Sequence, residues 1–188
     1  MTRNRRAVLL LTGLLIGPLP GVASAEPAGP LYRLVDTAAQ RLATADPVAA
    51  SKWIDGGPIT DAQRADQVLN AAADDATAHG VDPGYVRAVF TDQIHATEGV
   101  EYIRFAQWKF DPAAAPTSAP DLAQSRAAID GFNTVMVDEI ALQWNSLHSP
   151  SCPTDLQRAV EAVGASRQLD ALYRQALSSA TRSYCGLS

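Results

Sequence analysis

The chain has 188 residues and a net charge of −5 at pH 7, from 15 Lys and Arg against 20 Asp and Glu. This length suits one domain with a sizeable core, and the acidic balance argues against nucleic acid or an anionic membrane as a partner. The sequence contains no Gly-rich phosphate loop, repeat or long low-complexity tract, so it carries no motif for a nucleotide cofactor.

The N-terminus has the pattern of a secretory signal peptide. A start with three arginines precedes an apolar run that Gly17-Pro18 interrupts, and Ala23-Ser24-Ala25 forms a small-residue cleavage site. An uncleaved membrane anchor is the alternative, but the run is shorter than the ~20 residues needed to span a bilayer. We therefore expect cleavage near Ala25 to remove residues 1–25, leaving residues 26–188 as one domain that is secreted or periplasmic and free of the membrane. Without the three arginines, that domain has 12 basic and 20 acidic residues and a net charge of −8.

Apolar spacing predicts an all-α fold of about six helices in a single-domain bundle. Val and Ile recur at intervals of three and four, and no hairpin dipeptide separates the apolar runs. Capping residues and helix breakers set the expected segments. The first helix spans 31–45 and has a kinked extension through Trp53, which starts at an N-cap at Asp46-Pro47. A second helix runs from a Thr60-x-x-Gln63 capping box to His79-Gly80, and a third starts at Asp82-Pro83. After a linker over 111–120, a helix runs from Asp121 to about Leu147 with Leu142 and Trp144 facing inward, and a last segment carries both cysteines.

The segment 85–108 is expected to form the central helix. At about 100° per residue, its apolar face also carries three polar residues, Gln93, Thr97 and Glu101. The opposite side is expected to carry Asp92, His95, Glu98 and Tyr102. A carboxyl group turned inward needs a partner, because burial without one costs several kcal/mol. Arg104, one turn on, is a candidate for a structural ion pair with Glu101, and a ligand-binding site is the alternative.

The two cysteines, Cys152 and Cys185, predict a disulfide in an exported chain, with a metal pair or a nucleophile as the less favoured interpretations. A straight helix between them would hold its ends roughly 45 Å apart, whereas bridged Cα atoms lie about 6 Å apart. The segment must therefore fold back as a C-terminal helical hairpin. We expect its turn at Gly164-Ala165-Ser166, with Ser166 capping the final helix.

Cations rather than histidines form the candidate site. None of the three histidines shares spacing with another ligand type, so neither a metal site nor a Ser-His-Asp triad is predicted. Arg41 and Lys52 are eleven residues apart, almost a whole number of turns, and share a face if the helix continues across Pro47. Arg64 and Arg126 lie one turn inside helix starts, where the helix dipole and free amides favour anions.

Together these positions resemble the all-helical chorismate mutases, specifically the exported gamma subclass. The matching positions are Arg41, Lys52, Asp61, Arg64, Thr97 and Glu101, within or near the segments ADPVAASKW, VDPGYV, DQIHATEGVEYIRFAQWK, DLAQSRAAID and SCP…LYRQAL…SYC. The resemblance covers nearly the whole mature chain. It implies that chorismate rearranges to prephenate, a step of aromatic amino acid biosynthesis, by an intramolecular shift with no metal, covalent intermediate or organic cofactor. It also implies a homodimer.

The resemblance implies roles for the site residues. Arg41, Arg64 and Arg126 would bind the substrate carboxylates, for which planar guanidinium groups are suited. Lys52 and Glu101 would face the ether oxygen, where negative charge grows as the C–O bond breaks. Glu101 would act there in its protonated form, because an ionised carboxylate cannot donate a hydrogen bond. Thr97 would orient a carboxylate or Glu101.

Recognition of the substrate's ring hydroxyl departs from the family pattern. Many of these enzymes hold it with an acid or amide just after the second-helix arginine or one turn on, and here those positions are Ala65 and Val68. Asp61, Gln67 or a backbone amide is expected to substitute. Two alternatives stay open: an exported helical binding module that has lost turnover, and an isochorismate pyruvate lyase on a similar fold.

Overall fold

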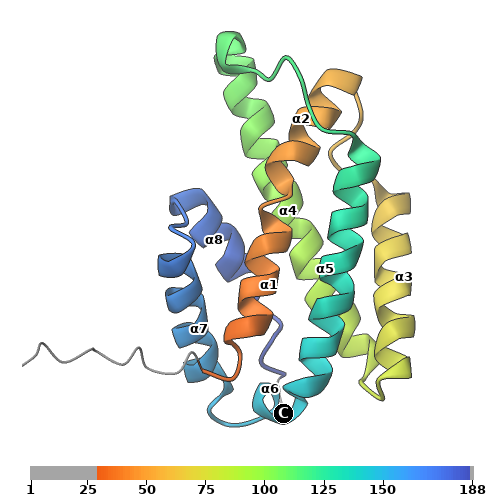
Figure 1. The fold of residues 1–188 in the computed structure, drawn as a ribbon, viewed down its shortest axis with the longest axis vertical. Coiled ribbons are helices and arrows are strands. Elements are labelled where there is room, and N and C mark those ends of the chain that lie inside the picture. The colour runs from red at the N-terminus through yellow and green to blue at the C-terminus, as the bar shows by residue number, and fades with distance from the viewer. Residues whose placement is uncertain (1–28, 187–188) are drawn as a thin grey trace, which may run out of the picture.

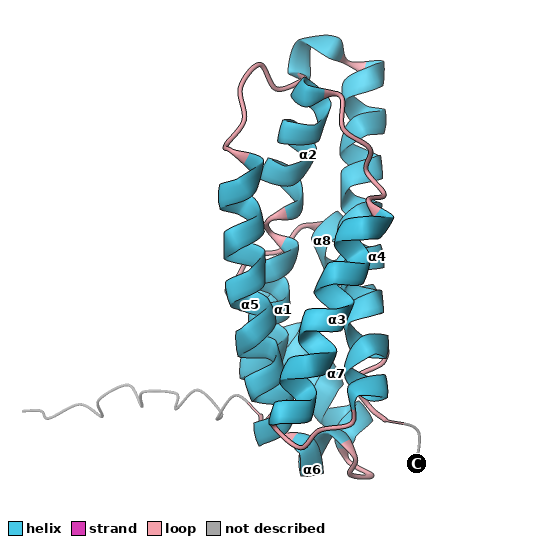
Figure 2. Ribbon diagram, turned by 90° about the vertical axis from the view of Figure 1, so that its right-hand side faces the viewer, coloured by secondary structure: helices cyan, strands magenta, loops and turns pink. Residues whose placement is uncertain are grey.

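The computed structural model describes residues 29–186, and this part of the chain is all-helical, as predicted (Figures 1 and 2). The elements are α1 (Tyr32–Leu42), α2 (Ala45–Asp55), α3 (Ala62–Ala78), α4 (Pro83–Phe110), the 3-10 turn η1 (Pro112–Ala114), α5 (Leu122–Leu142), α6 (Trp144–Leu147), α7 (Cys152–Ser166) and α8 (Ala171–Ala180). None of the described helices is long and apolar enough to cross a membrane. The predicted signal peptide, residues 1–25, lies outside the described residues.

The long helix α4 is the element on which most of the bundle packs. It contacts α3 and α2 along one side and α8 along another, while α1 packs against α5 and α7. Figure 1 shows α1 and α2 following one another along the long axis in front of α4, with α3 and α5 on one side and α7 and α8 on the other. The linker after η1 crosses to α5 over α2, where Ser51 Oγ donates a hydrogen bond of 2.7 Å to Pro120 O.

The predicted kink between α1 and α2 is confirmed, but the predicted N-cap of α2 is not. Ala43 and Thr44 keep right-handed helical dihedrals (φ −63°, ψ −15° and φ −74°, ψ −10°), so the chain bends without leaving the helical region. Thr44, not Asp46, occupies the N-cap position of α2. The carboxylate of Asp46 instead accepts from Arg104 of α4, with Nε to Oδ1 at 2.7 Å.

The start of α3 also differs from the prediction. Asp61 is the N-cap, and its Oδ1 accepts from Arg64 N at 3.0 Å. Thr60 makes no capping box, since its hydroxyl pairs with Tyr102 Oη at 3.0 Å. The carboxylate of Asp61 therefore lies at the helix start, beside the positive end of the α3 dipole. The predicted stop at Gly80, with φ +70°, and the predicted Asp82 cap of α4 are confirmed.

The predicted helix from Asp121 to Leu147 is broken. Asp121 caps α5 as expected, accepting from Ala123 N at 2.8 Å, but α5 ends at Leu142 and a single turn, α6, follows. Leu142 does not face inward, because its side chain is 73% exposed. Trp144 is partly buried, with its ring edge-on to Tyr85 of α4 at 5.2 Å between centroids.

The disulfide between Cys152 and Cys185 is confirmed, with 5.7 Å between the Cα atoms, and α7 and α8 form the expected hairpin. Its turn lies later than predicted. Ser166 is the last residue of α7, Gln168 takes φ +52°, and Asp170 caps α8 by accepting from Tyr173 N at 2.8 Å. Gly164 lies within α7 rather than in the turn.

The buried face of α4 is wider than one helical stripe. Gln93, Thr97 and Glu101 are buried, as predicted. Asp92 was expected to face solvent but is 8% exposed, and its carboxylate accepts from Ser183 Oγ at 2.6 Å and Arg182 Nη2 at 3.2 Å. The segment after α8 covers the side of α4 that carries Asp92, so α4 is buried on this side as well as on the side of Glu101.

Removing the disulfide should destabilise the domain. The bond closes a loop with a sequence separation of 33 residues, for which the chain-entropy model gives about 3–4 kcal/mol. We expect the double variant Cys152→Ser, Cys185→Ser to melt well below the parent in a thermal scan. A melting temperature indistinguishable from that of the parent would show that the hairpin is held by packing alone.

Candidate active site

One pocket brings together the predicted site residues from five helices and their flanking turns. Its charged and hydroxyl-bearing lining includes all seven, namely Arg41, Lys52, Asp61, Arg64, Thr97, Glu101 and Arg126. Its apolar lining includes Val48, Ile59, Ala65, Val68, Ile94, Leu122 and Ile129. A pocket with apolar walls and convergent cations suits a small anionic ligand with an apolar body.

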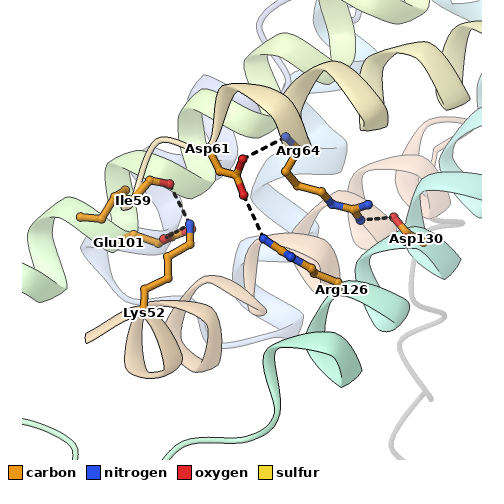
Figure 3. Close-up of polar contacts among 7 residues, drawn as sticks. All are labelled: Lys52, Ile59, Asp61, Arg64, Glu101, Arg126 and Asp130. Atoms are coloured by element: carbon orange, nitrogen blue, oxygen red, sulfur yellow. Dashed lines mark hydrogen bonds and ion pairs between the residues drawn. The ribbon is translucent and has the colours of Figure 1, made fainter. Parts of the chain in front are cut away.

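Lys52 and Glu101, which both line the pocket, form a buried polar contact (Figure 3). Lys52 Nζ donates to Glu101 Oε2 at 2.8 Å and to Ile59 O at 2.7 Å. The side chains of Lys52 and Glu101 are only 10% and 3% exposed. The suggested ion pair between Arg104 and Glu101 is wrong, because Arg104 pairs with Asp46 instead. Glu101 is thus met by a cation from α2 rather than by its own helix.

Burial sets the ionisation of Glu101. It raises the pKa of this carboxyl above its usual value, and the charge of nearby Glu98 acts in the same direction. The hydrogen bond and charge of Lys52 oppose the rise without cancelling it. Glu101 therefore holds its proton to a higher pH than a solvated glutamate, while its Oε2 accepts from Lys52.

Arg41 lies at the buried end of the pocket, 4% exposed. Its Nε donates to Asn133 Oδ1 at 2.8 Å, and its Nη1 lies 3.3 Å from Thr97 Oγ1 and 3.4 Å from Gln93 O. Burial lowers the pKa of Arg41 to about 10, which leaves it a cation at neutral pH. Asn133 was not predicted, because nothing local in the sequence indicates that α5 meets α1 there.

The segment after α8 supports the same end of the pocket from behind. Gln93 is fully buried, and its Nε2 donates to Ala180 O at 3.1 Å and to Tyr184 Oη at 3.3 Å. Tyr184 is itself fully buried, and its carbonyl oxygen accepts a hydrogen bond of 2.6 Å from Tyr85 Oη. Because Tyr184 directly precedes the bridged Cys185, the disulfide anchors a segment that packs against the Arg41 end of the pocket.

The outer end of the pocket carries a chain of ion pairs (Figure 3). Asp61 Oδ2 accepts from Arg126 Nη2 at 2.9 Å, while Asp61 Oδ1 accepts from Arg64 N. Arg64 Nη2 donates to Asp130 Oδ1 at 2.5 Å. Because Arg64 and Arg126 each use a single Nη in these contacts, their other nitrogens can donate to an anionic ligand.

A known protein family matches a range of this chain that includes six of the seven predicted site residues and ends before Arg126. The family model for chorismate mutase type II matches residues 32–102. The chain is 57% identical to the secreted chorismate mutase of Mycolicibacterium smegmatis over 180 residues, covering 94% of this chain and 99% of that protein. The chain belongs to the chorismate mutase family. A secreted chorismate mutase of Mycobacterium tuberculosis is 49% identical over 172 residues, covering 91% and 86% of the two chains.

Solved structures of other chorismate mutases share the fold. That from Burkholderia thailandensis has a TM-score of 0.79 at 35% identity, covering 83% of this chain and 99% of the other. That from Burkholderia phymatum has a TM-score of 0.79 at 31% identity, covering 84% and 97%. A secreted chorismate mutase from Yersinia pestis, at 20% identity, covers 81% and 94% with a TM-score of 0.65 and supports the fold alone.

The helical projection misplaced one residue that lines the pocket. Glu98 was expected on the outer side of α4 but lines the pocket. The pocket-facing residues of α4 are Ile94, Thr97, Glu98 and Glu101, which follow the i, i+3, i+4, i+7 spacing of one helical stripe. That spacing was the signal that could have placed Glu98 with Glu101.

Proposed function

We propose that the exported domain converts chorismate to prephenate by an intramolecular shift that needs no cofactor. The observation that carries the proposal is the buried contact between Lys52 and Glu101, at 2.8 Å, in a pocket that also holds three arginines. Chorismate is a dicarboxylate with an ether bridge, so it requires separate cationic sites for its carboxylates and a donor at the ether oxygen. Family membership and the lining of the pocket both support this assignment.

We assign substrate binding to the two ends of the pocket. Arg41 is held by Asn133 and Thr97 and would receive one carboxylate at the buried end. Arg126 is held by Asp61 and the guanidinium of Arg64 by Asp130, and both arginines would receive the other carboxylate at the outer end. Holding both carboxylates keeps the substrate in the compact conformer from which the new bond forms, which is a large part of the catalysis expected here.

We assign the chemical step to Lys52 and Glu101. As the C–O bond breaks, negative charge grows on the ether oxygen, and a cation and a neutral hydroxyl donor stabilise it in a site that excludes water. Lys52 supplies the cation. Glu101 supplies the donor, since its raised pKa favours the protonated form.

The first test is turnover by the mature protein, with product identification. Prephenate is the expected product; pyruvate from isochorismate would indicate a lyase, and no turnover of either would indicate a binding module.

Lys52→Ala should lower kcat by about two orders of magnitude, as removal of one such donor typically does. Lys109→Ala, at an exposed lysine beside Trp53, is the matched control and should turn over normally. Equal kcat values for both variants would take Lys52 out of the mechanism.

The pH profile tests the protonation state of Glu101. Because its pKa is raised and the protonated form is the productive one, kcat/KM should fall as pH rises through that pKa. Glu101→Gln keeps a donor that cannot ionise, so it should retain substantial turnover and lose much of this decline. Glu101→Ala should be impaired at every pH. If Gln proves as damaging as Ala, the position does not supply a neutral donor.

We also propose that the protein acts outside the cytoplasm after loss of residues 1–25. The relatives named secreted chorismate mutases support export. Intact-mass measurement of the exported protein should give a chain that begins near Glu26. A mass that includes the first 25 residues would contradict cleavage.

We propose in addition that the mature protein is a homodimer, as the family resemblance implies. The pocket is lined by residues of a single chain, from α1 to α5 and their turns. Each protomer of the dimer would therefore carry a full set of the proposed site residues.

A further inference from the structure

Arg41 is a buried cation that forms no ion pair with any residue that the structure describes. Its three hydrogen-bond acceptors, Asn133 Oδ1, Thr97 Oγ1 and Gln93 O, are all neutral. The other cations that line the pocket each pair with a carboxylate, and these are Lys52, Arg64 and Arg126. A buried charge without a counter-ion is costly, so the contacts of Arg41 leave its charge for an anionic ligand.

Asn133 makes the shortest of the three hydrogen bonds of Arg41, at 2.8 Å, and is itself 9% exposed. The guanidinium group is planar, so an acceptor at Nε fixes the plane in which its other nitrogens lie. With Nε on Asn133 and Nη1 near Thr97 and Gln93, Nη2 makes no hydrogen bond with a described residue. It therefore remains as a donor for a ligand in the pocket, which Arg41 lines.

The spacing along α5 brings Asn133 to this contact. Arg126, Ile129 and Asn133 follow the i, i+3, i+7 spacing of one helical stripe, and the first two line the pocket. Only the amide oxygen of Asn133 can face the guanidinium group, because that group has donors and no acceptor. The nitrogen end of the amide is then a donor, and the second cavity that Asn133 lines also carries the carboxylates of Asp75 and Asp130.

Asp130, three residues before Asn133, shows the contrast between an acid and an amide on α5. The side chain of Asp130 pairs with Arg64 while 54% exposed. An ion pair in contact with water is weak and leaves the arginine able to bind a second anion. A carboxylate at position 133 would be withdrawn from water, where attraction between charges is stronger, and would neutralise Arg41. The amide at this position supplies the oxygen without the charge.

We propose that Asn133 is a positioning residue whose neutral amide orients the guanidinium of Arg41 and leaves that cation uncompensated for a substrate carboxylate. The inference rests on the proposed function, since it takes a dicarboxylate as the ligand. It adds that the absence of charge at position 133, and not only the hydrogen bond, sets the affinity for the substrate. Stability and affinity should therefore respond to a carboxylate at this position in opposite directions.

The decisive variant is Asn133→Asp, which exchanges the amide for a carboxylate of the same size. The carboxylate would pair with Arg41, so the variant should melt at or above the wild-type temperature. It should raise KM for chorismate, and Kd for prephenate measured by calorimetry, by about tenfold or more, because the new carboxylate competes with the ligand for one cation. The value of kcat should change by less than about threefold, since a contact to a carboxylate outside the reacting bonds acts equally on the bound substrate and the transition state.

Asn145→Asp is the matched control. It makes the same substitution at an exposed residue of α6 that does not line the pocket. It should match the wild type in KM, in kcat and in Kd for prephenate.

Asn133→Ala tests the orienting hydrogen bond by itself. It leaves Nε of Arg41 buried without its acceptor, so the variant should melt below the wild type and, at a temperature where it is folded, should also have a raised KM. A purely structural role would make affinity follow stability, so that Asn133→Asp would bind at least as tightly as the wild type.

An Asn133→Asp protein that melts below the wild type, or that keeps the wild-type KM and Kd, would overturn the inference. So would a folded Asn133→Ala protein with the wild-type KM. Binding of prephenate does not require turnover. A wild type that fails to rearrange chorismate would therefore overturn the proposed function, and the Kd values for prephenate would still decide the inference.

Discussion

The contact between Lys52 and Glu101 is the constraint on which the pocket depends. A buried charge is tolerated only when hydrogen bonds replace its water, and Lys52 Nζ has Glu101 Oε2 and Ile59 O as acceptors. The contact joins α2 to α4, and Arg41 and Lys52 line the same pocket on either side of the bend at Ala43-Thr44. The fold thus places a cation and a carboxyl group in a region poor in water, where each has more influence on developing charge than at the surface.

Helical periodicity predicted much of this arrangement, because the face on which a helical residue lies depends only on its spacing along that helix. The spacing of Arg41 and Lys52, and that of Thr97 and Glu101, follows directly from helix geometry. The same projection failed for Asp92 because it assumed a single buried face. The structure has α3 and α2 on one side of α4 and α8 on another, so the boundary between buried and exposed positions could not be fixed from α4 alone.

Contacts between distant segments account for the parts that were not predicted. Asn133 meets Arg41 across 92 residues, and Tyr184 meets Gln93 across 91. Neither contact has a local sequence signal, since each depends on how α5 and the segment after α8 pack. The disulfide at Cys185 holds Tyr184 against α4, so the bond that the cysteine count predicted acts next to the Arg41 end of the pocket.

The charge balance of the pocket gives an independent reason for a neutral Glu101. Its lining has four cations, Arg41, Lys52, Arg64 and Arg126, and three carboxyl groups, Asp61, Glu98 and Glu101. If Glu101 carries no charge, four basic side chains face two acidic ones, and this excess of two matches a dicarboxylate ligand. An ionised Glu101 would leave one substrate charge uncompensated and would repel the charge that forms on the ether oxygen. Burial of Glu101 and the position of Glu98 therefore act together, because both favour the protonation state in which the pocket complements its ligand.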